Sequence, residues 1–231
     1  MRVAVVALAA LACMGRVAGA GERYYVLFFA HQTPDQRPEE AHSYADFIRA
    51  EVVDGAPPII LQRDTISWLP CTGVVRLRAL SPEPGRNFGL EETLDRFAGG
   101  KHVFAWGPYE MTPHAYQLAM ARKARLDSGE ILYRALDLVP GQTRRTSNCI
   151  HAMAEIDPEA RRMGQYNVKY GDAATKQAIR HYVVGGFLCN PCLPHDEIWL
   201  QLGLEGRPIN RRNDWEPKGI GRVLRPNARC D

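Results

Sequence analysis

The residue of this sequence best placed to do chemistry is Cys149, in the segment Thr146-Ser147-Asn148-Cys149-Ile150-His151. The pattern predicts a polar loop that turns into a helix at Ser147 or Asn148. A thiol in the first turn of a helix lies at the positive end of the dipole, beside unpaired backbone N–H groups, and both stabilise the thiolate. The same N–H groups could stabilise an oxyanion. Cys149 is therefore a candidate nucleophile; the alternative is a half-buried or disulfide-bonded cysteine.

A nucleophilic cysteine needs a base, which is usually a histidine. Among the seven histidines, His42 opens a predicted strand, where its side chain would be held rigidly. His151 follows Cys149 by two residues, so on a helix its side chain points about 200° away. The placement favours His42 over His151 as the partner of Cys149.

A second cysteine motif, Cys189-Asn190-Pro191-Cys192, allows three interpretations. It is a structural disulfide segment, a redox pair, or half of a zinc site completed by His181 and His195. Disulfides are the leading interpretation if the chain is exported, because disulfides persist in oxidising compartments. The sequence does not choose among the three ways of pairing these two cysteines with Cys71 and Cys230.

The elements that must position these residues follow from hydrophobic patterning and turn signals. From residue 21, the first part of the chain is predicted to be mostly antiparallel sheet. Helices are then predicted to alternate with short strands. A single α+β domain over 21–231 fits best, with an irregular tail from about 210. The predicted strands are 24–31, 42–53, 59–69, 74–80, 102–106 and 130–136. The predicted helices are 90–98, 112–126, 147–156, 172–184 and 194–204.

His42-Ser43-Tyr44 on an early strand and Asn148-Cys149 on a later helix resemble the circularly permuted papain-like group, which includes the lecithin–retinol acyltransferase-like enzymes. The resemblance implies a small, partly barrel-like antiparallel sheet with helices packed on it. It also implies Cys149 as nucleophile and His42 as base, with Asp64 or Ser67 orienting the imidazole. Trp106-Gly107-Pro108-Tyr109-Glu110, with the two motifs, also looks similar to a family of uncharacterised exported bacterial proteins, which supplies no activity.

The first twenty residues predict export. Arg2 precedes an apolar run, and Ala18-Gly19-Ala20 matches a signal-peptidase site, so cleavage near Ala20 would leave 211 residues in the periplasm or outside the cell. The run is shorter than the roughly 20 apolar residues of a membrane span, and no later stretch qualifies. The near balance of 29 basic and 26 acidic residues gives no electrostatic footprint for nucleic acid.

Two functions fit these features. The first is an exported cysteine hydrolase or acyltransferase that attacks an amide or ester of a cell-envelope peptide, protein or lipid acyl substrate, with no metal or cofactor. The second is a non-catalytic, disulfide-stapled binding or structural protein of the envelope. The sequence does not decide between them, and it gives no oligomeric state.

Overall fold

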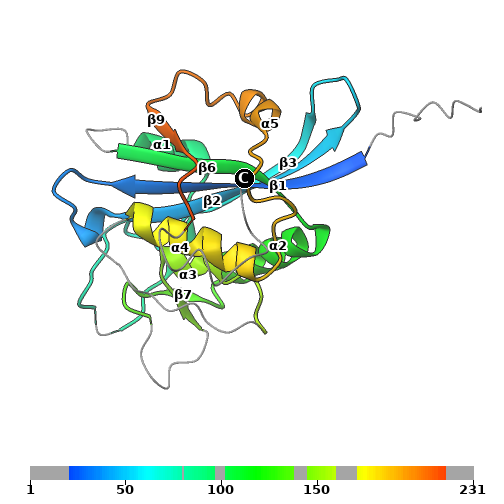
Figure 1. The fold of residues 1–231 in the computed structure, drawn as a ribbon. Helices are drawn as coiled ribbons and strands as arrows, with labels where there is room; N and C mark the ends of the chain where they lie inside the picture. The colour runs from blue at the N-terminus through cyan, green and yellow to red at the C-terminus, as the bar shows by residue number, and fades with distance from the viewer. Residues whose placement is uncertain (1–20, 80, 97–101, 138–144, 160–170, 217–231) are drawn as a thin grey trace, which may run out of the picture.

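A computed structural model describes five stretches of the chain: residues 21–79, 81–96, 102–137, 145–159 and 171–216. The predicted signal peptide lies outside the described residues, as does Cys230. The described residues form a mixed α+β fold, which confirms the predicted class (Figure 1).

The central sheet of the described residues has the strand order β3-β2-β1-β6-β9. Strands β3, β2, β1 and β6 are antiparallel to one another in turn, whereas β9 runs parallel to β6. The sheet is open, with β3 and β9 at its edges. Its strands are β1 (Gly21–Gln32), β2 (His42–Val52), β3 (Ile59–Ile66), β6 (His102–Met111) and β9 (Ile209–Arg212).

Smaller elements connect and cover this sheet. Two short strand pairs are β4 (Trp68–Pro70) with β5 (Gly85–Asn87), and β7 (Leu132–Tyr133) with β8 (Thr146–Ser147). A 3-10 turn, η1, spans Pro38–Glu40. The helices are α1 (Leu90–Arg96), α2 (Pro113–Asp127), α3 (Cys149–Ala154), α4 (Gly171–Val184) and α5 (Asp196–Gln201).

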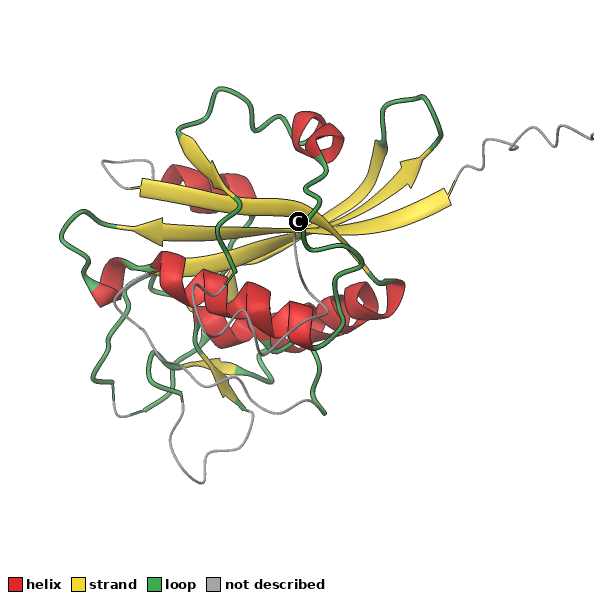
Figure 2. Ribbon diagram, in the orientation of Figure 1, coloured by secondary structure: helices red, strands yellow, loops and turns green. Residues whose placement is uncertain are grey.

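Helices cover both faces of the sheet (Figure 2). Side chains alternate between the two faces along each strand, so β1 contributes to two hydrophobic clusters. Val26 and Phe28 pack with α2, α3 and α4 on what we term the lower face, as viewed in Figure 1. Leu27 and Phe29 pack with α1 and α5 on the upper face. This alternation decides which candidate residues can meet.

Two helix starts follow the predicted capping. The hydroxyl of Thr112 accepts a hydrogen bond from the Ala115 N–H (3.2 Å), and Pro113 opens α2. The side-chain oxygen of Asn148 accepts one from the His151 N–H (2.9 Å) at the start of α3. The predicted placement of Cys149 in the first turn of a helix is therefore confirmed.

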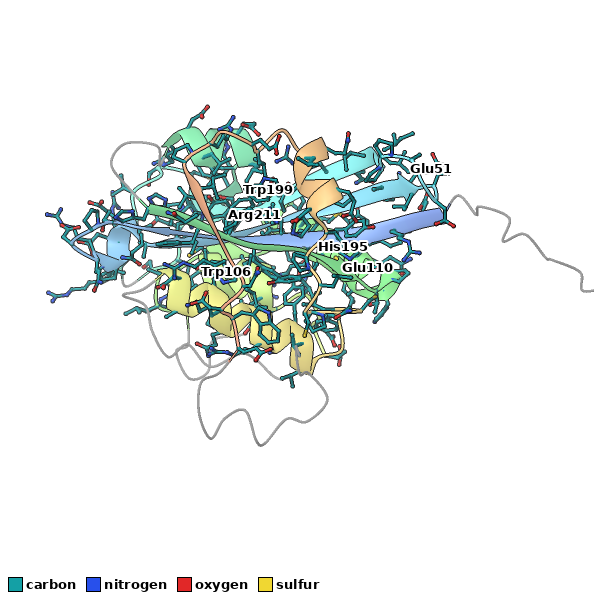
Figure 3. The ribbon with its side chains drawn as sticks, turned by 45° about the horizontal axis from the view of Figure 1, so that its top comes forward. Glu51, Trp106, Glu110, His195, Trp199 and Arg211 are labelled. Carbon is teal, nitrogen blue, oxygen red and sulfur yellow. The ribbon has the colours of Figure 1, made fainter. Side chains whose placement is uncertain are left out.

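Two sequence-based expectations are wrong. The described residues between β4 and β5 contain no strand, although 74–80 alternates like one. Val75 and Leu77 there pack against the lower cluster from a loop, which explains the alternation. The start of the predicted irregular tail instead forms β9, whose Arg211 guanidinium lies 4.6 Å from the ring centroid of Trp199 in α5 (Figure 3).

Candidate functional site

Cys149 lies at the first position of α3, where the helix packs against β2 on the lower face. Its side chain is buried, with 8% of the residue exposed. Asn148 caps the helix, and both residues border a small cavity with Ser43 of β2. Cys149 is thus positioned by the start of α3, which Asn148 caps and which packs against β2.

A buried carboxylate holds this helix start in place. Asp137 accepts hydrogen bonds from the Asn148 backbone N–H (2.9 Å) and side-chain amide (3.1 Å). It also lies 2.8 Å from Nδ1 of His151, and both side chains are fully buried. Asp137 belongs to no motif in the sequence, and the one signal for it is an acidic residue among the apolar residues at 136–139. His151 therefore faces Asp137.

The surroundings of Cys149 favour its neutral thiol. Burial raises the pKa of Cys149 to about 11, and the negative charge of Asp137 acts in the same direction. Hydrogen bonding from the Ser43 backbone N–H opposes both effects but does not offset them. The thiolate is therefore a minor form of Cys149 at pH 7.

The cavity beside Cys149 has a volume of about 30 Å³. Its walls are mostly apolar, from residues such as Val75, Leu77 and Ile150. The described residues that line it include no histidine, aspartate or glutamate. Among the described residues, the lining of this cavity therefore supplies no imidazole or carboxylate to the thiol.

His42 lies on the opposite face of the sheet from Cys149. Its Nε2 is 2.8 Å from Oγ of Ser67, and that hydroxyl accepts a hydrogen bond from Thr93 of α1 (2.9 Å) on the upper face. The next residue of β2, Ser43, points to the lower face, where it donates to the Gly171 carbonyl (3.2 Å). The side chains of His42 and Ser43 therefore point to opposite faces of β2, and the cavity beside Cys149 includes Ser43 but not His42.

The imidazole of His42 is also held in its neutral form. Burial lowers its pKa well below the usual 6.5, and the nearby His31 and Arg96 lower it further. His42 is almost fully buried at 1% exposure. Its surroundings stabilise an uncharged ring inside the core.

Asp64 does not touch His42. It lies on β3, accepts a hydrogen bond from Gln62 (2.6 Å), and has an oxygen 3.7 Å from Nζ of Lys123. Ser67, the other candidate for orienting the imidazole, makes that contact instead. The expected site consists of Cys149, His42 and Asp64. None of the contacts described joins any two of these residues.

Four cysteines lie in the described residues: Cys71, Cys149, Cys189 and Cys192. Among the described residues, Cys71, Cys149 and Cys189 are free thiols, with Cys71 and Cys189 exposed. Cys192 is disulfide-bonded, and none of those three is its partner. Cys189 and Cys192 therefore do not form a disulfide with each other. Within the described ranges, no three His, Cys, Asp or Glu side chains gather closely enough to bind a metal ion.

A larger cleft of about 510 Å³ lies at the β3 edge of the sheet. Residues 63–65 of β3 form one wall, and the segment 87–92, which leads into α1, forms another. Lys123 of α2 also lines it. Because residues 63 and 64 point to opposite faces, the cleft wraps around the strand edge. We refer to it as the β3 cleft.

Comparisons with protein-family models, with curated proteins and with solved structures find no match to this chain. None of the described helices has both the length and the apolar character needed to cross a membrane.

Proposed function

We propose that this chain is an exported, non-catalytic binding protein whose ligand occupies the β3 cleft. The observation that carries the proposal is the contrast between the two cavities. The β3 cleft, at about 510 Å³, falls within the roughly 300–1,000 Å³ typical of ligand sites. The cavity at Cys149, at about 30 Å³, has room for about two water molecules, each needing roughly 10–15 Å³.

The state of Cys149 supports binding over catalysis. A cysteine nucleophile reacts as the thiolate, and the raised pKa of Cys149 disfavours that form. The candidate base, His42, faces the other side of the sheet and contacts Ser67. Thiolate formation by proton transfer from Cys149 to His42 has no short path in this arrangement.

The β3 cleft offers several kinds of recognition group. The partly exposed side chains of Arg63 and Lys123 supply positive charge, and Asp64 and Glu91 supply negative charge. Phe88 adds an aromatic surface. Apart from Phe88, Gly89 and Leu90, the lining residues are polar or charged, which suits a ligand that forms hydrogen bonds.

Two measurements on the mature chain, residues 21–231, test the proposal. In the first, the ¹⁵N-labelled protein is titrated separately with acetate, ethylammonium and N-methylacetamide. We expect at least one probe to give saturable amide shifts centred on Arg63, Asn87 and Lys123. Shifts that do not saturate, or that spread evenly over the surface, would contradict it.

The second measurement compares wild type with Cys149→Ala in the hydrolysis of p-nitrophenyl acetate. We expect equal rates, because the thiol is buried and neutral. A burst of p-nitrophenol that requires Cys149 would reject the non-catalytic assignment.

Export, the other part of the proposal, rests on the sequence of residues 1–20. Expression of the full chain in a bacterial host, followed by fractionation and intact-mass analysis, is the direct test. The expected product is a periplasmic or secreted protein that begins at Gly21. An uncleaved chain in the cytoplasm would overturn export without affecting the binding proposal.

A cysteine hydrolase or acyltransferase of the permuted papain-like type is the second candidate. One observation favours it: Cys149 opens a capped helix packed on the sheet, with backbone N–H groups at its sulfur. The order His42 before Cys149 is also that of the permuted group. This candidate requires a rearrangement that brings a base to the lower face.

A further inference from the structure

We propose that the ligand of the β3 cleft is an extended peptide, which adds as a strand to the outer edge of β3 and places a peptide group between Arg63 and Asn87. This inference rests on the proposed binding function and specifies its ligand. It draws on the open strand edge, on two polar atoms without partners, and on the charges of the cleft.

The strand edge is the first support. β3 ends the strand order of the sheet, and none of the backbone hydrogen bonds described outside the strand ladders involves residues 59–66. An open edge presents a row of N–H and C=O groups to an incoming strand. Ile59 and Leu61 on the same strand are 58% and 42% exposed, so the edge also offers apolar contacts.

Arg63 supplies a donor without an acceptor. Its Nε donates to the buried carboxylate of Asp46 (2.5 Å), which fixes the guanidinium. Its Nη1 lies 3.8 Å from Glu91, beyond hydrogen-bond distance. Its Nη2 is buried and has no hydrogen-bond partner among the described residues. A buried donor in this state favours an added acceptor oxygen.

Asn87 supplies the complementary acceptor. Its side-chain nitrogen donates to Asp127 at the end of α2 (2.7 Å). Because a carboxylate only accepts, this contact fixes the orientation of the amide and leaves Oδ1 on its other side. That oxygen is buried and has no donor among the described residues. One unmet donor and one unmet acceptor in the same cleft match the C=O and N–H of a peptide group.

The charges around these atoms also suit a peptide. Glu91 lies 3.8 Å from Arg63, and Asp64 lies 3.7 Å from Lys123, so the cleft presents both signs of charge. An anionic ligand would meet the acidic groups, and a cationic ligand would meet Arg63 and Lys123. An uncharged main chain is not repelled by either set of charges. To reach the buried atoms the peptide has to move side chains of the cleft, and Lys123 and Glu91 are 25% and 52% exposed, each in a surface ion pair, with Asp127 and Arg207 respectively.

The test uses the mature chain and an uncharged probe, the acetylated and amidated pentapeptide Thr-Val-Thr-Val-Thr. We expect saturable ¹⁵N shifts at residues 59–66 and at Asn87. The matched probe Thr-Pro-Thr-Pro-Thr lacks the alternate N–H donors and is expected to produce no saturable shift. Equal binding of both probes, or no saturable shift with the first, overturns the proposal.

Two variants locate the contact. Arg63→Lys keeps a positive charge near Asp46 but loses the Nη2 donor, and we expect affinity for the probe to fall about fivefold or more. Arg125→Lys is the matched control, because Arg125 is an ion-paired arginine of α2 that does not line the cleft. Equal affinity in wild type and Arg63→Lys overturns the assignment of the contact.

The remaining outcomes separate the two proposals. Saturable binding of acetate in the cleft without any pentapeptide binding keeps the binding function and rejects the peptide. A concentration-dependent dimer in sedimentation, with β3 amides protected and no peptide binding, assigns the edge to a second copy of the chain and also rejects the peptide. A crystal structure with the probe bound, in which ordered water and not the peptide is hydrogen-bonded to Arg63 Nη2 and Asn87 Oδ1, also rejects the peptide proposal.

Discussion

At the scale of single residues, Cys149 combines the expected position with unexpected surroundings. Its place at the start of α3 follows from the polar segment before it, which the sequence displays. Its burial depends on contacts with β2 and with the loop around Val75, which are distant in sequence. Local sequence therefore predicts where the thiol lies on its helix, whereas long-range packing decides its pKa.

Alkylation kinetics give the first prediction. In a Cys71→Ser, Cys189→Ser background, iodoacetamide should react with Cys149 far more slowly than with free cysteine at pH 7. The rate should rise with pH toward an apparent pKa of about 11, because burial favours the neutral thiol. Mass spectrometry of the Cys149 peptide across pH 6 to 10 measures this, and the rate should still be rising at pH 10, about one unit below the expected pKa. Faster reaction than free cysteine at pH 6 to 7 would instead support the hydrolase.

The second prediction concerns Asp137. Asp137→Ala removes one acceptor of the Asn148 backbone N–H, one of its side-chain amide, and a contact of His151 Nδ1, all of them buried. We expect a loss of roughly 3 kcal/mol or more in the free energy of unfolding, because each buried polar group that loses a hydrogen bond costs about 1–3 kcal/mol. Urea denaturation measures the change. Glu130→Ala, which breaks an exposed ion pair with Arg125, is the control and should cost about 1 kcal/mol or less. A similar cost in both variants would contradict the role of Asp137.

The expected pairing of His42 with Cys149 depends on which face of the sheet each side chain occupies. Alternation along β2 puts His42 and Tyr44 on one face and Ser43 and Ala45 on the other, and the sequence displays that pattern. It does not display which face α3 covers. That information resides in the packing of α3 and α4 against β2, which no local pattern encodes.

At the scale of elements, long apolar strands and capped helices were predictable, and short elements were not. β1, β2, α2 and α4 lie close to their expected bounds, because each has a strong period and a clear start signal. β9 is only four residues long and rich in arginine, and its pairing with β6 comes from tertiary contact. Strand order likewise depends on partners far apart in sequence.

The start of α4 gives the third prediction. A Cβ atom at Gly171 would lie 2.4 Å from the carbonyl oxygen of His31, a backbone atom that cannot move aside. Gly171→Ala should therefore shift α4 away from the β1–β2 connection and destabilise the protein by about 1–3 kcal/mol. Thermal denaturation monitored by circular dichroism checks this. Gly21→Ala, where a Cβ meets nothing within 4 Å, should leave the midpoint nearly unchanged. An unchanged midpoint in Gly171→Ala would refute the close approach.

At the scale of the whole molecule, two neutral histidines couple stability to pH. Burial lowers the pKa of both His42 and His181 below 6.5. The unfolded chain therefore binds more protons than the folded one below that pH. The stability that the neutral rings contribute is fully present above pH 6.5 and is lost as the pH falls toward their folded-state pKa values.

The fourth prediction follows from this sign. The free energy of unfolding of wild type should fall steadily as the pH drops from 6.5, and His42→Gln should show a shallower fall. Urea denaturation at a series of pH values measures both slopes. His114→Gln changes an exposed histidine of α2 and should keep the wild-type slope. Should His42→Gln not fold, the ring protons of His42 in wild type should show no titration by NMR while the protein stays folded. Titration near pH 6.5 would contradict the buried, neutral state.

The place of β1 at the centre of the sheet also has a consequence for how the chain acquires its structure. The apolar strand β1 comes first, and its partners β2 and β3 follow closely, so this meander can pair early. Its other side has no partner until β6 emerges, and the outer edge of β6 has none until β9. If the chain emerges from its N-terminus, β1 therefore waits half-paired for about 70 residues, and the outer edge of β6 waits for about 100 more. Were the chain exported as proposed, these unpaired edges would be the parts of it that a chaperone has to shield.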